Sequence, residues 1–289
     1  MLLVAGGQLD PNIGALLQRM LARGTAFREL LVGPDLRPRL TIDLASGRLV
    51  LDGEATAPTG CFIRHDVFLH QKTGRPADHA AALNWFYAIR GWSLSRPTLK
   101  LLNRHSYLSE NNKLENLLLA ARVGLSVPET VVTNDFGDGR QDADGWIQKP
   151  VAGGDYTTTL GDFLTKHDPE VLGYPRFVQR RMARPELRIY RVGPRLFGFH
   201  LHSSEIDYRT THEVAIEPAE VPAETGRSLL ALCDLLGLDF AAADFMRDAT
   251  GRLRFLEVNT QPMFAAFDAV VQGRLCDAII DVLEQGDAG

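Results

Sequence analysis

Cysteine is scarce in this chain of 289 residues, and its three copies are far apart. Cys61, Cys233 and Cys276 form no CxxC pair, so the sequence predicts neither a zinc site nor a disulfide framework. We interpret the three as small buried apolar residues of a protein in a reducing compartment.

Long apolar runs are also missing. No stretch approaches about 18 apolar residues, so no membrane span and no membrane partner are expected. The first residues, Met1 to Gly7, carry no positive charge and reach glycine early, which predicts a first β-strand and not a signal peptide. These features predict a cytoplasmic protein.

Blocks of a single charge are absent as well. The net charge of −5 is spread along the chain, and no cluster of Lys or Arg has the character of a nucleic-acid-binding surface. A local basic groove for an anionic substrate stays open, and so does the choice between a monomer and a homodimer. The P-loop pattern GxxxxGK[ST] and the Ser/His/Asp and Cys/His signatures of covalent catalysis are missing too.

Short apolar strands alternate with amphipathic helices, which is typical of an α/β fold of one to three domains. The expected strands are Leu2–Ala5, Leu40–Asp43, Arg48–Leu51, Cys61–Ile63, Thr130–Thr133, Trp146–Pro150, Arg176–Gln179, Glu186–Val192, Arg195–His202, Phe240–Met246 and Leu253–Val258. The expected helices are Asn12–Arg23, Ala77–Gly91, Ser109–Val123, Thr225–Leu236 and Val270–Glu284. The polar segment Ser203–Glu220 has few apolar anchors and is predicted to be mobile.

The strand that ends at Asn259 carries the sharpest chemical signal. Glu257 and Asn259 are two residues apart, so their side chains point to the same face, and Asp244 can lie opposite them across a hairpin. Hard oxygen ligands of this kind hold magnesium beside a nucleotide. The structural alternative, a solvated strand end, explains any one of these residues but not the three together.

Two lysines precede this strand in the chain. Lys149 ends a strand that leads into the turn of Gly153 and Gly154, where a lysine and exposed backbone amides can bind phosphate. Lys113 lies on a helix, where a solvated surface lysine is the ordinary interpretation. Further along, Glu186 and Arg188 share one strand face and can contact a ribose hydroxyl and a phosphate, although a surface ion pair is the alternative.

Taken in order, these motifs resemble the ATP-grasp superfamily, in the branch of the ribosomal-protein glutamate ligases. The motifs are Lys113, Gly124–Thr130, Gln148–Pro150, Gly153–Gly154, Gln179, Glu186–Arg188, Asp244 and Glu257–Asn259. The resemblance implies an α/β ATP-grasp fold, with ATP between a central and a C-terminal α+β subdomain. The expected domains are an N-terminal α/β domain (1–100), a central subdomain (101–180) and a C-terminal subdomain with the metal site (181–289).

The resemblance also implies roles for individual residues. Lys113, Lys149, Gly153 and Gly154 would contact the phosphates of ATP, and Glu186 the ribose. Arg188 and Arg209 would neutralise the transferred phosphoryl group, and Asp244, Glu257 and Asn259 would hold Mg²⁺. The hinge strand around adenine would comprise Gln179, Arg180, Arg181 and Met182.

Within that branch the chain resembles graspetide (microviridin-type) peptide-maturation synthetases. The features that carry this resemblance are Val132–Asp135, Ser203–Arg209 and Asn259–Phe264. It implies an ATP-dependent ligase that joins a carboxylate to an amine or hydroxyl through an acyl phosphate, on a ribosomally made peptide. Departures are Gln261–Met263, in place of the more usual sequence after Asn259, and a somewhat short N-terminal domain.

Two alternatives remain open at this point: a small-molecule carboxylate–amine ligase acting on an amino acid or specialised metabolite, and a non-catalytic nucleotide-binding protein. Arg64, at a strand end, is predicted to pair with an acidic group of the substrate, and Asp207 is a second candidate substrate contact. Candidates for the general base are His65, His105, His200, His202, His212 and Asp207.

Overall fold

The computed structural model describes residues 1–106, 112–136, 143–152, 157–166, 171–203 and 214–285. These residues form helices and four β-sheets, which confirms the predicted α/β class. The chain divides into two compact units. Unit 1 comprises Met1–His105, Gly237–Phe240 and Gln261–Gly289, and unit 2 comprises Ser106–Leu236 and Ala241–Thr260.

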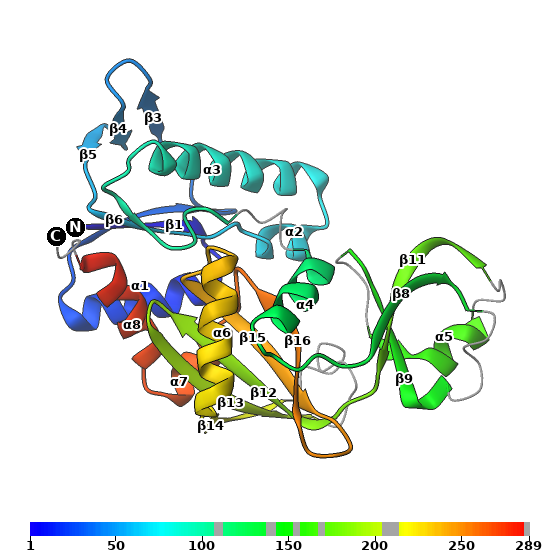
Figure 1. Ribbon diagram of the computed structural model, residues 1–289. Coiled ribbons are helices and arrows are strands. Elements are labelled where there is room, and N and C mark those ends of the chain that lie inside the picture. The colour runs from blue at the N-terminus through cyan, green and yellow to red at the C-terminus, as the bar shows by residue number, and fades with distance from the viewer. Residues whose placement is uncertain (107–111, 137–142, 153–156, 167–170, 204–213, 286–289) are drawn as a thin grey trace. The chain divides into compact units, whose positions relative to one another are not determined.

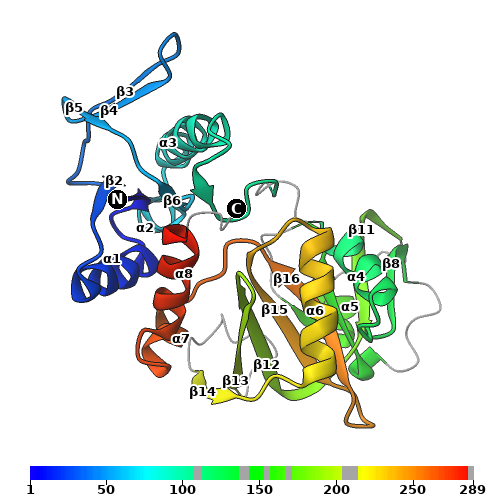
Figure 2. The same ribbon diagram turned by 60° about the vertical axis from the view of Figure 1, so that its left-hand side comes forward.

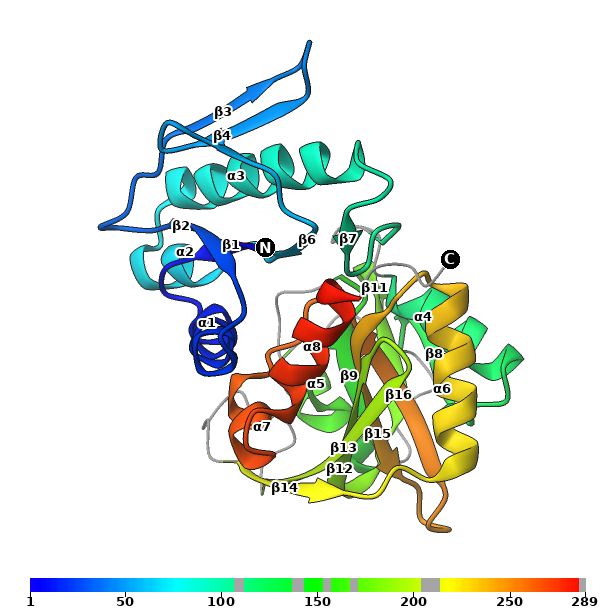
Figure 3. The same cartoon turned by 90° about the vertical axis from the view of Figure 1, so that its left-hand side faces the viewer.

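Unit 1 is built on a parallel sheet with the strand order β2-β1-β6-β7. Its strands are β1 (Leu2–Gly7), β2 (Phe27–Val32), β6 (Gly60–Ile63) and β7 (Lys100–Leu101). Its helices are α1 (Pro11–Arg23), α2 (Phe68–Thr73), α3 (Pro76–Leu94), α7 (Ala265–Val270) and α8 (Arg274–Glu284). Helix α3 lies along one face of the sheet, and α1 and α8 lie on the other side (Figures 1 and 3).

Helix α1 shows how local sequence fixes an element of unit 1. Asp10 caps its N-terminus by accepting a hydrogen bond from the backbone N–H of Asn12 (2.8 Å), and proline follows at the first helical position. Gly24 ends the helix in the left-handed conformation. Ile13, Leu16 and Met20, spaced at the helical period, form its buried face.

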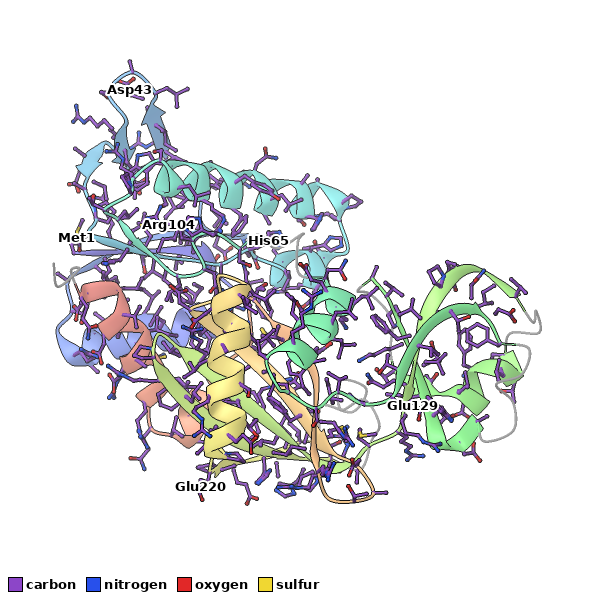
Figure 4. All side chains as sticks on the ribbon, in the orientation of Figure 1. Met1, Asp43, His65, Arg104, Glu129 and Glu220 are labelled. Carbon is purple, nitrogen blue, oxygen red and sulfur yellow. The ribbon has the colours of Figure 1, made fainter. Side chains whose placement is uncertain are left out.

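A small antiparallel sheet, with the order β3-β4-β5, packs beside α3 in unit 1. Its strands are β3 (Leu40–Asp43), β4 (Arg48–Leu51) and β5 (Glu54–Thr56). Leu49 and Leu51 of β4 join Trp92 of α3 in one apolar core. Asp43, labelled in Figure 4, lies toward the far end of the β3–β4 hairpin, which was predicted from the sequence with these bounds.

The C-terminal segment differs from its prediction. A single helix was expected over Val270–Glu284, but α7 and α8 are separate helices because Gln272 (φ 57°) and Gly273 (φ 88°) turn the chain between them. The segment also belongs to unit 1, where Asn12 Oδ1 accepts hydrogen bonds from the N–H groups of Phe264 (2.5 Å) and Ala265 (2.9 Å). The division at residues 100 and 180 stays a prediction, and nothing in the sequence indicated this return of the chain.

Unit 2 contains two larger sheets. The first has the order β10-β9-β11-β8, with α5 (Leu160–Lys166) and the short 3-10 helix η2 (Ala143–Gly145) packed against it. Its strands are β8 (Thr130–Asp135), β9 (Trp146–Pro150), β10 (Thr158–Thr159) and β11 (Val171–Arg180). All their pairings are antiparallel.

The second sheet of unit 2 has the order β14-β13-β12-β15-β16. Its strands are β12 (Ala183–Val192), β13 (Arg195–His202), β14 (Ala215–Ala219), β15 (Phe240–Arg247) and β16 (Leu253–Asn259). Helix α6 (Ala223–Leu235) lies across one face of it, and α4 (Lys113–Arg122) lies beside β16 and α6 (Figure 2). The prediction that Ser203–Glu220 is mobile is wrong for Ala215–Ala219, which form β14; residues 204–213 lie outside the described residues.

None of the helices in the described ranges is both long and apolar enough to cross a lipid bilayer.

Arg64 has buried partners inside unit 1 that the sequence did not indicate. Its side chain is only 4% exposed, and Nε lies 2.9 Å from Oδ2 of the fully buried Asp10. Its Nη1 donates to the carbonyl of Pro262 at 2.9 Å. The guanidinium is therefore held by partners inside unit 1, and its predicted contact with an acidic substrate group stays a prediction.

Replacing Arg64 with Ala is expected to lower the free energy of unfolding by about 3–5 kcal/mol, because Asp10 would be left as a buried charge without its counterion. Chemical denaturation monitored by the fluorescence of Trp85 and Trp92 in unit 1 measures this loss. The control is Arg75→Ala, which breaks an exposed ion pair with Asp78 and should cost no more than about 1 kcal/mol. Equal losses in the two variants would contradict a structural role for Arg64.

Candidate active site

The end of the β15–β16 hairpin in unit 2 brings the three predicted metal ligands together. Asp244 lies opposite Glu257 in the strand register, and Asn259 shares the face of Glu257. Asn259 Nδ2 lies 3.4 Å from Asp244 Oδ2 and 3.5 Å from Glu257 Oε1. The amide would therefore have to turn to present its oxygen to a metal ion.

This donor set fits Mg²⁺ bound next to a nucleotide. Within the described part of the chain, no three His, Cys, Asp or Glu side chains are grouped closely enough to hold a metal ion. The metal ligands available at this end of the hairpin are therefore two carboxylates and one amide. Mg²⁺ beside ATP commonly takes one or two carboxylates and completes its coordination with phosphate oxygens and water, so the set is sufficient.

Arg188 is bound to one of these carboxylates. Its Nε lies 2.6 Å from Asp244 Oδ1 and its Nη2 lies 2.9 Å from Oδ2, which is a bidentate ion pair between the neighbouring strands β12 and β15. Both side chains are buried. The predicted phosphate-binding arginine and the predicted metal ligand are thus direct partners.

Lys113 pairs in the same way with the second carboxylate. Asn112 caps α4 by accepting the N–H groups of Leu114 (3.0 Å) and Glu115 (3.2 Å), which places Lys113 at the first helical position. A lysine there opposes the helix dipole. Its Nζ lies 2.9 Å from Glu257 Oε2, and this contact offsets the unfavourable position.

Lys149, at the end of β9, is the third cation of the site. Burial lowers its pKa, and nearby Lys113 acts in the same direction, while Glu257 and Asp244 oppose the shift. Its Nζ lies 5.6 Å from the ring centroid of Phe177 on the adjacent strand β11. Burial would raise the pKa of Glu257, but Lys113 and Lys149 outweigh it and hold that pKa at about 2.

Glu186 behaves in the opposite way. Burial raises its pKa to about 8, and the neighbouring Asp244 adds to the shift, although Arg188 and Arg184 oppose it. The nearest cation is Arg188 Nη2, 3.5 Å from Glu186 Oε1. Glu186 is therefore mainly a neutral hydrogen-bonding group at neutral pH, which suits a contact with a ribose hydroxyl better than a contact with a cation.

Arg184 is a residue of this site that the sequence interpretation missed. It lies two positions before Glu186, near the start of β12. Its Nη1 lies 4.0 Å from Glu186 Oε2. Its place two residues before Glu186 was the available signal in the sequence.

Several groups of the predicted hinge segment, residues 179–182, already contact other residues of unit 2. Gln179 is buried, and its Nε2 donates to Thr130 Oγ1 at 2.9 Å. The backbone N–H groups of Arg180 and Arg181 donate to Glu129 and Gly145, each at 2.9 Å. The guanidinium of Arg180 stacks on Trp146 at 4.8 Å. Adenine recognition by this segment would have to use other groups, such as those of Met182.

Four predicted site residues lie outside the described residues: Gly153, Gly154, Asp207 and Arg209. Their predicted roles stay predictions.

The described histidines give little support to the predicted general bases. His200 pairs in register with Leu187 while Arg188 pairs with Phe199, so His200 and His202 lie on the sheet face opposite Arg188. His202 is also bound to Glu217 at 2.7 Å. His65, in unit 1, is buried, and burial together with His79 lowers its pKa. His105 belongs to unit 1, and His212 lies outside the described residues.

Several solved structures that resemble this chain are ATP-grasp ligases. The ligase PsnB, in complex with minimal precursor, Mg and ADP, has a TM-score of 0.76 at 22% identity, covering 98% of this chain and 97% of its own. The macrocyclase MdnC from Microcystis aeruginosa, bound with precursor peptide MdnA, has a TM-score of 0.71 at 19% identity, covering 99% and 100%. The D-cycloserine synthetase DcsG has a TM-score of 0.57 at 15% identity, covering 98% and 100%.

No protein-family model matches the chain, and a comparison with curated protein sequences gives no significant match. The structural likeness nevertheless spans almost the whole chain. This protein therefore has the ATP-grasp fold, and the resemblance deduced from its motifs is confirmed at the level of the fold.

Glu186→Gln is expected to stabilise the protein increasingly as the pH rises from 5 to 8. In the wild type, folded Glu186 holds its proton up to about pH 8, whereas the unfolded state loses it near 4.5. Unfolding thus releases a proton in this window, so rising pH costs stability, and glutamine removes that cost. The difference should reach on the order of a few kcal/mol at pH 8, measured by chemical denaturation.

The matched control is Glu220→Gln, at an exposed position, whose effect should not grow with pH. A Glu186→Gln effect that stays constant between pH 5 and pH 8 would show that Glu186 is already ionised in the folded protein.

Proposed function

We propose that this protein is an ATP- and Mg²⁺-dependent ligase that activates a carboxylate as an acyl phosphate and joins it to an amine or hydroxyl. One observation carries the proposal. Three cations gather around the carboxylates of Asp244 and Glu257 in unit 2. Arg188 forms an ion pair with Asp244, and Lys113 forms one with Glu257. The charge of Lys149 interacts with both carboxylates. Such a cluster can exchange its internal ion pairs for the charges of a magnesium–nucleotide complex.

One group of these residues would hold the metal ion of that complex, and another group would bind its phosphates. Asp244, Glu257 and Asn259 would hold Mg²⁺, which when bound neutralises phosphate charge and fixes the phosphate geometry. Lys113, Lys149 and Arg188 would bind the phosphates, since each would gain an anionic partner as the carboxylates turn to the metal. Gly153, Gly154 and Arg209 would complete the phosphate contacts. Gln179–Met182 would surround the adenine and Glu186 would contact the ribose.

The reaction would proceed in two displacements. A carboxylate oxygen of the substrate attacks the γ-phosphorus of ATP, the bond to the β,γ-bridging oxygen breaks, and ADP leaves. Arg188 and Lys149 stabilise the charge on the transferred phosphoryl group. An amine or hydroxyl of the acceptor then attacks the acyl carbon, loses its proton, and displaces inorganic phosphate. The chain needs no covalent nucleophile for this chemistry.

A ribosomally made peptide is the substrate that the comparisons favour. PsnB and MdnC, whose solved complexes contain precursor peptides, match this chain with TM-scores of 0.76 and 0.71, against 0.57 for DcsG. A small-molecule ligase of the latter kind is the second candidate. A non-catalytic nucleotide-binding protein is disfavoured, because binding alone does not require both metal-binding carboxylates and a buried arginine paired to one of them.

Glu257→Gln is expected to reduce ATP-dependent ADP formation by roughly a hundredfold or more, because it removes a charged metal ligand while preserving the shape of the side chain. The measurement is ADP release as a function of Mg²⁺ concentration. Asp234→Asn, on α6, changes the exposed partner of Arg191 of β12 and should leave the rate unchanged. Normal turnover of the Glu257 variant at ordinary Mg²⁺ would remove the metal assignment.

Hydroxylamine offers a direct test of the acyl phosphate. With ATP, Mg²⁺ and a peptide rich in Asp, Glu, Ser and Thr, the wild-type protein should convert a peptide carboxylate to a hydroxamate, detected by mass spectrometry. Without hydroxylamine, the same peptide should lose the mass of one water for each bond formed. If free amino acids support ADP release and hydroxamate formation while no peptide does, the small-molecule ligase takes the place of the peptide ligase.

A further inference from the structure

Unit 1 contains a pocket that the proposed chemistry does not use. Its volume is about 710 Å³, within the range of sites that hold organic ligands. It is lined by the β3–β4 turn, by β5 and the residues after it, by the end of α3 and by the end of α8. Trp92, Leu99 and Leu283 give it a buried apolar floor.

The charged side chains around this pocket are mostly basic. Arg48, Arg96 and Lys100 line it, and the acidic lining residue is Glu284. Glu284 lies 3.7 Å from Arg23, which offsets its charge. Asp43 does not line the pocket, but it faces Arg48 across the hairpin and offsets part of its charge, so the positive charge of the lining comes mainly from Arg96 and Lys100. The pocket therefore favours an anionic ligand.

Arg96 is held in place for such a ligand. Its guanidinium lies over the ring of Trp92 at 5.1 Å, and its Nη2 donates to the carbonyl of Gly47. Trp92 Nε1 donates to the same carbonyl at 3.0 Å. Gly47 has φ +66°, and a Cβ there would meet Arg96 Nη2 at 2.6 Å, so this turn requires glycine. A guanidinium fixed in this way loses little side-chain entropy when it binds a carboxylate.

The same pocket borders an edge of backbone. Strand β5 pairs with β4 on one side, and among the described residues no strand pairs with its other side. Ala55 and Thr56 of β5 line the pocket. An extended peptide can add to such an edge through main-chain hydrogen bonds while its side chains enter the neighbouring pocket.

We propose that this pocket binds an extended segment of the peptide substrate with acidic and apolar side chains in alternation. Acidic side chains pair with Arg48, Arg96 and Lys100, and apolar side chains rest on the floor around Trp92. The inference builds on the proposed peptide ligase, and it assigns part of the recognition of that peptide to unit 1, whereas the residues that would bind ATP belong to unit 2.

The test measures binding in the absence of ATP. The probe is a short fluorescein-labelled peptide of alternating glutamate and valine, titrated by fluorescence anisotropy, and the matched probe has glutamine in place of glutamate. We expect the acidic probe to bind more tightly than the glutamine probe, with an affinity that falls as salt is added. Arg48→Glu should weaken binding about tenfold, and Arg48→Lys should retain it.

Arg37→Glu is the matched control, since Arg37 is exposed in unit 1 and does not line the pocket; it should bind the acidic probe like the wild type. Equal affinity for the two probes, or an Arg48→Glu affinity equal to that of Arg37→Glu, would overturn the proposal. Full competition by free glutamate would overturn it in favour of a site for small carboxylates. These binding measurements contain no ATP and no turnover. They therefore test the pocket independently, and a failure of the proposed ligase chemistry would not change their outcome.

Discussion

The bidentate ion pair between Arg188 and Asp244 is the contact on which the candidate active site depends. Its two hydrogen bonds, 2.6 and 2.9 Å, join neighbouring strands in a buried position. Burial of either charge alone would be costly, so each residue requires the other. The carboxylate that would bind a metal and the guanidinium that would bind a phosphate therefore hold each other in place, as Lys113 and Glu257 also do. Burial still raises the pKa of Asp244, although Arg188 opposes the shift.

Glu186 shows the consequence of this pairing. Asp244 takes the bidentate face of Arg188, and Glu186 is left with a more distant contact of 3.5 Å, too weak to offset its burial. Its pKa rises to about 8, whereas that of Glu257, between two lysines, falls to about 2. Two buried carboxyl groups in one cluster thus have opposite preferences, one neutral for hydroxyl recognition and one ionised for cation binding.

Periodicity and local turn chemistry explain how much of this was predictable. The hairpin pairing of Asp244 with Glu257 and the shared face of Glu186 and Arg188 follow from the period of two along strands, and the structure has both. Spacing carries no information about long-range partners. Nothing in the sequence around Arg64 indicates that Asp10 and Pro262 occupy its guanidinium. The positive φ of Gln272, which splits the last helix, is likewise set by packing, because glutamine does not favour it.

The proposed phosphate and metal site in unit 2 restricts the types of its residues more strictly than the proposed peptide pocket in unit 1 does. Phosphoryl transfer demands cations and metal ligands of fixed type, so motifs for them can be recognised in unit 2 from the sequence alone. Peptide recognition demands only a shaped surface with charges that match one partner, and many sequences provide that. The pocket beside Trp92 is built from four separate chain segments, with Arg48, Arg96 and Glu284 far apart in sequence. A site of that kind leaves no linear motif, which is why the proposed peptide-binding pocket could not be predicted from the sequence.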